Sequence, residues 1–340
     1  MHQPFHSHRQ RAMLVIGSLM LCAVAGLLFA GMTGSVAVPL ADMPAALRQL
    51  ARGESASLAA SLIELRASRA LTAFVTGGAL ALAGVMMQAL LRNPLADPYV
   101  LGISAGASVG ALLAMLLMAA AIVIDLAALG GAVAVSMLLY LLARRDLRGG
   151  LAAEGGTSML LLTGVILSSA CMALITLMLS IAPEGRLRSM IFWMIGDLAG
   201  APLRLAPWLI LGAALVYALR NARAMNVVAL HAEAAATLGI QVGSLRKGLF
   251  FVSGVLTASA VTSAGSVGFV GLIVPHACRF AFGPDHRVLV PAAVLAGGSF
   301  LVLCDTLART VIAPQQLPVG AITAIIGAPV FLYQLHRLRR

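Results

Sequence analysis

The sequence predicts an all-α membrane protein, a polytopic bundle of about ten transmembrane helices. Hydrophobic residues make up 61% of the 340 residues and charged residues 10%, and the mean hydropathy is +0.99. A surface of this composition suits lipid rather than water, so the backbone must satisfy its own hydrogen bonds. The apolar runs are long and continuous, whereas a membrane barrel would show alternating segments of about ten residues.

Ten apolar runs approach the length needed to cross a membrane, which is about 20 residues. The run 267–281 is one of the two shortest and holds Pro275, His276 and Arg279, so nine crossings are the alternative. The first run follows Arg9 and Arg11 but is too long for the core of a signal peptide, and we expect an uncleaved helix. The runs are 12–32, 70–91, 100–121, 126–143, 159–182, 205–219, 248–264, 267–281, 288–304 and 317–335.

The positive charges predict the orientation, because loops on the cytoplasmic side carry an excess of lysine and arginine. With ten crossings, one set of loops and span ends carries fifteen of the 23 basic residues and the opposite set carries eight. Both termini are therefore expected in the cytoplasm. The net charge of +11 reflects this bias and requires no nucleic acid partner. The four cysteines lie within apolar runs, without the spacing of a metal site or a disulfide framework.

We expect one transmembrane domain over residues 1–340. Residues 1–11 form a short disordered cytoplasmic tail, with a metal-binding tail as the alternative because three histidines lie there. Residues 44–51, within the longest outer loop, form a short interfacial helix. Residues 220–247 form the longest inner loop. Leu230 to Leu238 within that loop is rich in alanine and leucine and predicts a helix that ends at Gly239.

Small residues in several runs predict close helix packing. Gly102, Gly106 and Gly110 form two overlapping GxxxG steps, which let helix backbones approach one another. In the inner loop, Leu230, Ala234 and Leu238 form an apolar face on a helix with few charges. Such a face suits docking into the groove of a partner protein.

The motifs of several enzyme and transporter classes are absent. There is no HExxH, no GxSxG and no GxxxxGK[ST], so the chain cannot bind ATP through a P-loop. The acidic residues lie near span ends or in loops, and nothing indicates a proton relay. Asp305 lies four residues before Arg309, where an ion pair can form along a helix. If transport is active, its energy comes from another polypeptide.

Three segments carry a resemblance to a known family. They are 78–107, which contains Asn93-Pro94, 266–287, which contains Pro275-His276 followed by Arg279, and 317–331. Together they resemble the permease subunits of bacterial ABC importers for iron-siderophores, haem and vitamin B12, the FecCD type. The likeness extends from about residue 60 to residue 335.

The resemblance implies the type II importer permease fold and a homodimer with the transport pathway along its axis. It also implies two cytoplasmic ABC ATPase subunits, which bind ATP and Mg, and a periplasmic substrate-binding protein. The chain itself would bind no cofactor and no metal, and it would lie in the bacterial inner membrane. The pathway would move a metal chelate from the periplasm to the cytoplasm by alternating access.

The resemblance also implies roles for particular residues. Arg66 and Arg69, and Arg309 after Asp305, match arginines that dock the binding protein, although Ser68 replaces the usual proline before the second arginine. Asp197 replaces a small neutral residue; it either shapes substrate entry or pairs with a nearby arginine, and we favour the pair. The expected ATPase-coupling residues are Leu230, His231, Glu233, Ala234, Leu238 and Gly239. The expected pathway-lining residues are Thr163, Ser168, Ser169, Thr176 and Ser180.

Two alternatives accompany these expectations. The hydroxyl groups of the pathway helix could bond to their own helix backbone instead of facing a solute. A passive channel or an ion-coupled carrier is the rival function, and it would depend on a proton gradient and on no ATPase. A membrane enzyme is disfavoured because no nucleophile or metal constellation is found. The sequence does not distinguish iron-siderophore, vitamin B12 and haem.

Overall fold

The computed structural model describes residues 5–39, 41–148, 156–230, 235 and 237–338. Its elements are α1 (Phe5–Met32), α2 (Met43–Ala51), α3 (Leu58–Leu91), the 3-10 helix η1 (Pro98–Leu101), α4 (Ile103–Leu116), α5 (Ala121–Arg148), α6 (Gly156–Ser180), α7 (Glu184–Ile195), α8 (Leu205–Leu230), α10 (Val242–Ala264), α11 (Val270–Phe282), α12 (His286–Thr310) and α13 (Val319–Leu338). Helices alone make up the regular structure of these residues, which confirms the predicted fold class.

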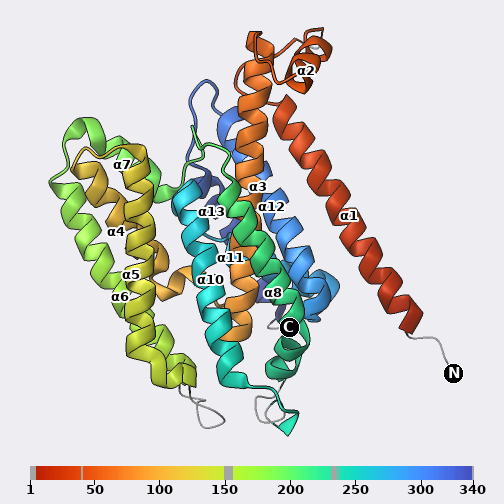
Figure 1. Cartoon of the computed structure of the whole chain (residues 1–340), viewed down its shortest axis with the longest axis vertical. Coiled ribbons are helices and arrows are strands. Elements are labelled where there is room, and N and C mark those ends of the chain that lie inside the picture. The colour runs from red at the N-terminus through yellow and green to blue at the C-terminus, as the bar shows by residue number, and fades with distance from the viewer. Residues whose placement is uncertain (1–4, 40, 149–155, 231–234, 236, 339–340) are drawn as a thin grey trace.

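Ten of these helices correspond one to one with the ten apolar runs. Among the described residues, seven helices are long and apolar enough to cross a membrane, and α4, α11 and α13 are shorter apolar helices. The two short helices α2 and α7 lie at one end of the bundle, and both termini lie toward the other (Figure 1). We call these the α2 end and the terminal end.

Several predicted boundaries were wrong. Helix α1 begins at Phe5, so most of the expected tail 1–11 is helical. Helix α8 continues to Leu230 and α10 begins at Val242, so the inner loop expected at 220–247 is much shorter. The apolar runs are shorter than the helices, because alanine, arginine, methionine and leucine are strong helix formers and continue the helices beyond the runs.

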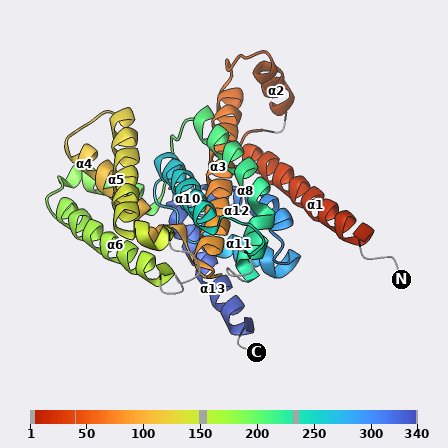
Figure 2. The same cartoon turned by 60° about the horizontal axis from the view of Figure 1, so that its bottom comes forward.

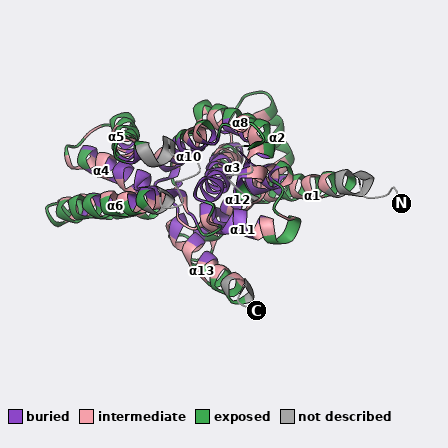
Figure 3. Cartoon of the chain, turned by 90° about the horizontal axis from the view of Figure 1, so that it is seen from below, coloured by how far each residue is buried: buried purple, intermediate pink, exposed green. Residues whose placement is uncertain are grey.

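Helix α3 forms the centre of the molecule, and α10 and α12 pack along it. In its most apolar stretch, 94% of the residues are buried, and Figure 3 shows its ribbon among the other helices. The hydroxyl of Ser57 caps its first turn by accepting a hydrogen bond from the Ala60 N–H at 3.2 Å, which satisfies one of the free N–H groups there. In the most apolar stretch of α1, by contrast, only 6% of the residues are buried, and the N-terminal end of this helix lies apart from the bundle (Figure 2).

Glycine pairs permit the closest helix contacts. A Cβ atom at Gly77 of α3 would overlap the carbonyl oxygen of Gly297 in α12. The predicted GxxxG steps are used in the same way, because Gly106 and Gly110 of α4 face the α5 backbone at Gly131 and Ala127. Small residues at these positions bring backbones together in the manner expected for membrane helices.

Two breaks in the helices meet inside the bundle. The Ser104 and Ser266 hydroxyls lie 2.8 Å apart, and the Val267 N–H donates to the Tyr99 hydroxyl at 3.1 Å. These contacts join the start of α4 to the turn between α10 and α11. They satisfy polar groups where irregular backbone would otherwise be costly in lipid.

Candidate translocation and coupling sites

The three segments that carry the family resemblance lie against one another. Gln88 Nε2 of α3 donates a hydrogen bond to the Leu272 carbonyl at 3.3 Å, and Arg279 Nη1 of α11 donates to Gln88 Oε1 at 2.9 Å. Helix α13, from the third segment, packs on α11. No local sequence pattern predicts this arrangement, since Gln88 and Arg279 are 191 residues apart.

The three arginines expected to dock a binding protein cluster around Asp305 near the α2 end. Arg69 donates to both Asp305 oxygens at 2.8–3.0 Å and to Gln316. Arg309 lies 3.6 Å from Asp305 and donates to the Ala30 carbonyl of α1. Arg66 donates to the Met32 and Val36 carbonyls. All three guanidinium groups therefore have partners within the chain, and Arg66 and Arg309 are buried.

The five hydroxyls expected to line the pathway lie along α6. Each one donates to a carbonyl of its own helix three or four residues earlier, at 2.8–3.0 Å. This is the alternative geometry considered from the sequence. Ser169, Thr176 and Ser180 are nevertheless exposed, whereas Thr163 and Ser168 are half-buried. A hydroxyl that donates to its helix still presents oxygen lone pairs to a neighbour.

The expected coupling segment is only partly described. His231, Glu233 and Ala234 lie outside the described residues, and Leu230 is the last residue of α8. Ala235 is buried. Leu238 exposes 69% of its surface, and Gly239 follows it in a turn with φ +78°, at the position where the sequence predicted a stop. The Leu238 side chain thus presents an apolar group beside the terminal end of α8 and the start of α10.

Beside this segment, Asn226 connects α8 to the start of α12. Its Nδ2 donates to Asp285 Oδ1 at 2.7 Å, and its Oδ1 accepts from the His286 backbone N–H at 2.9 Å and lies 2.6 Å from His286 Nδ1. Asp285 also caps α12 by accepting from the Arg287 N–H. We call this group the α8–α12 latch. Sequence reasoning missed it because its members are 59 and 60 residues apart.

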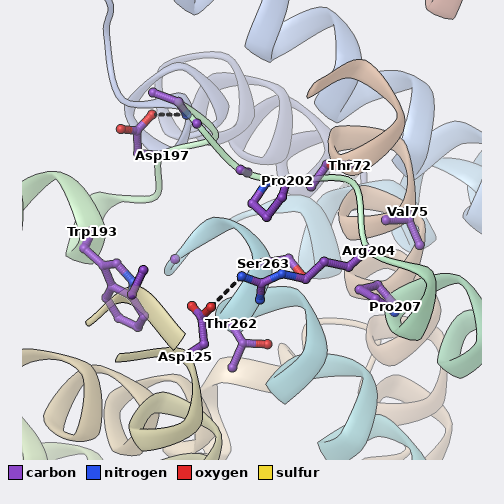
Figure 4. Close-up of a pocket in the computed structure, with 15 residues that line it drawn as sticks. Thr72, Val75, Asp125, Trp193, Asp197, Pro202, Arg204, Pro207, Thr262 and Ser263 are labelled. Carbon is purple, nitrogen blue, oxygen red and sulfur yellow. Dashed lines mark hydrogen bonds and ion pairs between the residues drawn. The ribbon is translucent and has the colours of Figure 1, made fainter. Parts of the chain in front are cut away.

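A crevice of about 180 Å³ lies near the α2 end, between α3, α5, α10 and the chain that leads into α8 (Figure 4). Arg204 pairs with Asp125 of α5 across it. The prediction that Asp197 pairs with an arginine was wrong, because no such pair forms among the described residues. Asp197 Oδ1 instead accepts from the Ala199 N–H at 2.8 Å, because a carboxylate can close a tight turn two residues on.

Comparisons with known proteins agree with this arrangement. The profile of the FecCD transport family matches residues 20–337. The chain belongs to the FecCD transport family. It is 39% identical over 282 residues to the vitamin B12 import system permease protein BtuC of Escherichia coli O9:H4, covering 82% of this chain and 84% of that one. It is also 39% identical to the cobalamin import system permease protein BtuC of Halobacterium salinarum, covering 80% and 72%.

Solved structures support the same family and fold. An inward-facing ABC transporter described as of the metal-chelate type matches with a TM-score of 0.79 and 27% identity, covering 96% of this chain and 99% of that chain. PsaBC from Streptococcus pneumoniae, solved in complex with a Fab, matches with a TM-score of 0.53 at 15% identity, and this likeness concerns the fold alone.

As a FecCD protein, the chain is a multi-pass permease subunit of an ABC importer, and a separate subunit hydrolyses ATP. No group of three or more His, Cys, Asp or Glu side chains that could hold a metal ion is found in the part of the chain that the structure describes.

Proposed function

We propose that this FecCD permease pairs with a second copy of itself and imports a corrinoid, vitamin B12, from the periplasm to the cytoplasm. The observation that carries the proposal is the 39% identity to two cobalamin permeases, one bacterial and one archaeal, over most of the chain. Iron-siderophore is the second candidate, because the solved transporter of the metal-chelate type matches nearly the whole chain. No observation on this chain favours haem.

The α2 end faces the periplasm in this proposal, and both termini lie in the cytoplasm. Support comes from the charges, since fifteen of 23 basic residues fall on the terminal side of a ten-helix chain. Cytoplasmic segments of membrane proteins carry this excess. The membrane is then the bacterial inner membrane.

Coupling to the ATPase begins at the segment 230–239. Leu238, 69% exposed, supplies an apolar contact for a cleft in the ATPase, as amphipathic helices do in grooves. The end of α8 lies beside it, and the sequence assigns His231, Glu233 and Ala234, which lie outside the described residues, to the same contact. The ATPase pair binds ATP and Mg, and its closure moves this segment. The α8–α12 latch then carries the movement to α12, which packs along the central α3.

The binding protein docks on the α2 end. Arg69 is the arginine of the cluster best placed to take part, because its Nη1 contact to Gln316 lies at the exposed rim. Arg66 and Arg309 are buried and support the docking surface indirectly. They hold the ends of α1, α3 and α12 together by donating hydrogen bonds to the carbonyls of Met32 and Ala30. Exposed charge pairs contribute about 1 kcal/mol or less each, so docking depends on several contacts together.

The pathway runs beside α6. Ser169, Thr176 and Ser180 expose their hydroxyl oxygens on this helix while each hydrogen remains bonded to the helix itself. Such a wall accepts weak hydrogen bonds but donates few, so it would hold a bulky chelate loosely. Alternating access requires that the solute enter and leave readily, and a loosely holding wall favours this.

The test is uptake into proteoliposomes that contain the permease, its ATPase and its binding protein, with cobalamin, a ferric siderophore and haem compared. We expect ATP-dependent uptake of cobalamin, lost when Leu238→Arg prevents ATPase binding. The matched control is Leu238→Met, which keeps an apolar group at the same position. Uptake of the siderophore alone would transfer the proposal to the second candidate. Uptake driven by a proton gradient without ATPase would overturn it.

A further inference from the structure

We propose that the groove between α5, α8 and α10 binds one phospholipid with an ammonium-bearing, zwitterionic head, such as phosphatidylethanolamine. The lipid belongs to the leaflet at the α2 end. Its head lies in the crevice of Figure 4, and one acyl chain follows the groove toward the middle of the bundle.

The groove has the shape and lining of an acyl-chain site. It encloses about 400 Å³, and its outer walls include Val133 and Met137 of α5 and Phe251 and Val255 of α10, which are 40–54% exposed. These apolar side chains face outward on helices of membrane-spanning length, so the groove is open to lipid. It lies on the side of the bundle opposite α13 (Figure 3).

The length of the groove matches one leaflet. Its lining on α10 runs from Phe250 to Ser263, thirteen steps along the helix, which is about 20 Å at 1.5 Å per residue. Half of the hydrocarbon core is about 15 Å thick, and the head group region adds to that. The groove therefore extends from the head groups to about the middle of the membrane.

The groove continues into the polar crevice, which makes the combined site amphipathic. Arg204, Pro207, Thr262 and Ser263 line both. The apolar lining of the groove ends at Arg204, which directly precedes α8. A lipid that lies along the groove would place its head group beside Arg204 and its chain against α5 and α10.

The charges in the crevice select the head group. Its charged lining residues are Asp125, Asp197 and Arg204, two carboxylates and one guanidinium, so the local charge is negative by one. The Thr262 and Ser263 hydroxyls donate to their own helix and offer lone pairs. The ammonium group of a zwitterionic head supplies N–H donors for these oxygens and a positive charge that balances the carboxylates. Arg204 has further N–H groups that can donate to the phosphate of the same head. A purely anionic head group would meet a surplus of negative charge.

The test measures lipid retained by the full-length protein in nanodiscs made from equal amounts of phosphatidylethanolamine and phosphatidylglycerol. After transfer to detergent, mass spectrometry should find about one phosphatidylethanolamine per chain. Val255→Trp, which fills the groove, should lower this amount about tenfold, equal to about 1.4 kcal/mol. Val216→Trp is the matched control, because Val216 is 49% exposed against 52% for Val255 and lies outside the groove. It should leave retention unchanged.

A second variant tests the head group separately. Asp197→Asn keeps an oxygen for the Ala199 N–H but removes one negative charge, so the preference for phosphatidylethanolamine over phosphatidylglycerol should fall toward equality. Equal retention by Val255→Trp and Val216→Trp would overturn the acyl-chain site. Phosphatidylglycerol enriched on the unaltered protein would overturn the head-group assignment. Size-exclusion profiles identify any variant that fails to fold.

Discussion

Asp305 binds arginines from two helices while it is itself 1% exposed. Arg69 of α3 contacts both of its oxygens, and Arg309 of α12 lies 3.6 Å away while donating to the α1 backbone. In a buried position the removal of one partner leaves the remaining charges without their counter-charge, which is strongly unfavourable. The carboxylate thus joins the ends of α1, α3 and α12.

Replacing Asp305 with alanine should lower the free energy of unfolding by about 3–5 kcal/mol, because two guanidinium groups lose their buried counter-charge. Unfolding of the purified protein in mixed micelles measures this. Asp125→Ala is the control, since the Asp125–Arg204 pair is more exposed and should contribute about 1 kcal/mol or less. Equal losses in the two variants would contradict the central role of Asp305.

Asp285 gives a prediction about pH. Burial raises its pKa, but hydrogen bonds from Arg287 and Asn226 and the nearby positive charge lower it more, and the net pKa lies below the usual value. Its stabilising contribution is therefore complete above the unfolded pKa of about 3.9 and is lost as the pH falls through the lower folded pKa. The melting temperature difference between the unaltered protein and Asp285→Asn should be constant above about pH 5 and shrink below that. A difference that grows at low pH would contradict this sign.

At the residue scale the sequence predicted only what lies nearby in the chain. The Asp305–Arg309 pair could be predicted because four residues make one helical turn. Arg69, the stronger partner, is 236 residues from Asp305, and only the packing of α3 on α12 brings them together. Asn226 and Asp285 escaped prediction for the same reason.

Among the elements, α3 and α12 depend on their glycines. Gly77→Ala places a methyl group on the Gly297 carbonyl oxygen, so the helices must separate, and the free energy of unfolding should fall by about 1–3 kcal/mol. Gly212→Ala in α8 meets nothing within 4 Å and should be neutral or slightly stabilising. Thermal unfolding of the two variants measures the difference. A neutral Gly77→Ala would show that the contact is looser than the structure indicates.

The α8–α12 latch predicts a defect in coupling. Asn226→Ala removes the bonds to Asp285 and His286, so ATPase-driven movement should reach α12 poorly. We expect ATP hydrolysis by the assembled complex to persist while uptake falls about tenfold, a loss of about 1.4 kcal/mol. Asn221→Ala is the control, because Asn221 donates only within α8. Parallel losses of hydrolysis and uptake would show a structural effect and contradict the latch.

The helices themselves were predictable from apolar run length, but their ends were not. Leu205 to Leu230 continues past its apolar part because seven of the eleven residues 220–230 are alanine, arginine, methionine or leucine, which are good helix formers. The turn at Gly239 followed from its glycine, and the short helix expected at 44–51 corresponds to α2 at Met43–Ala51. The breaks that meet at Ser104 and Ser266 had no such signal, because their stability comes from each other.

At the scale of the whole molecule, orientation is testable with cysteine labelling in a variant that lacks the four native cysteines. Glu54→Cys, exposed at the α2 end, should react with an impermeant maleimide added to intact cells. Gln241→Cys, exposed between α8 and α10, should react only after the membrane is opened. The reverse pattern would place the α2 end in the cytoplasm and overturn the direction of import.

The central position of α3 has a consequence for biosynthesis. Its final neighbours α8, α10, α11 and α12 are made later, and α12 ends at Thr310, 219 residues after Leu91. At about 5–20 residues per second, ribosomes need about 10–45 s to make that stretch. During this time α3, with its threonines and Gln88, must remain in lipid or against the insertion machinery. Cells that lack a membrane insertase or chaperone should therefore degrade this protein chiefly as a nascent chain, before α12 emerges.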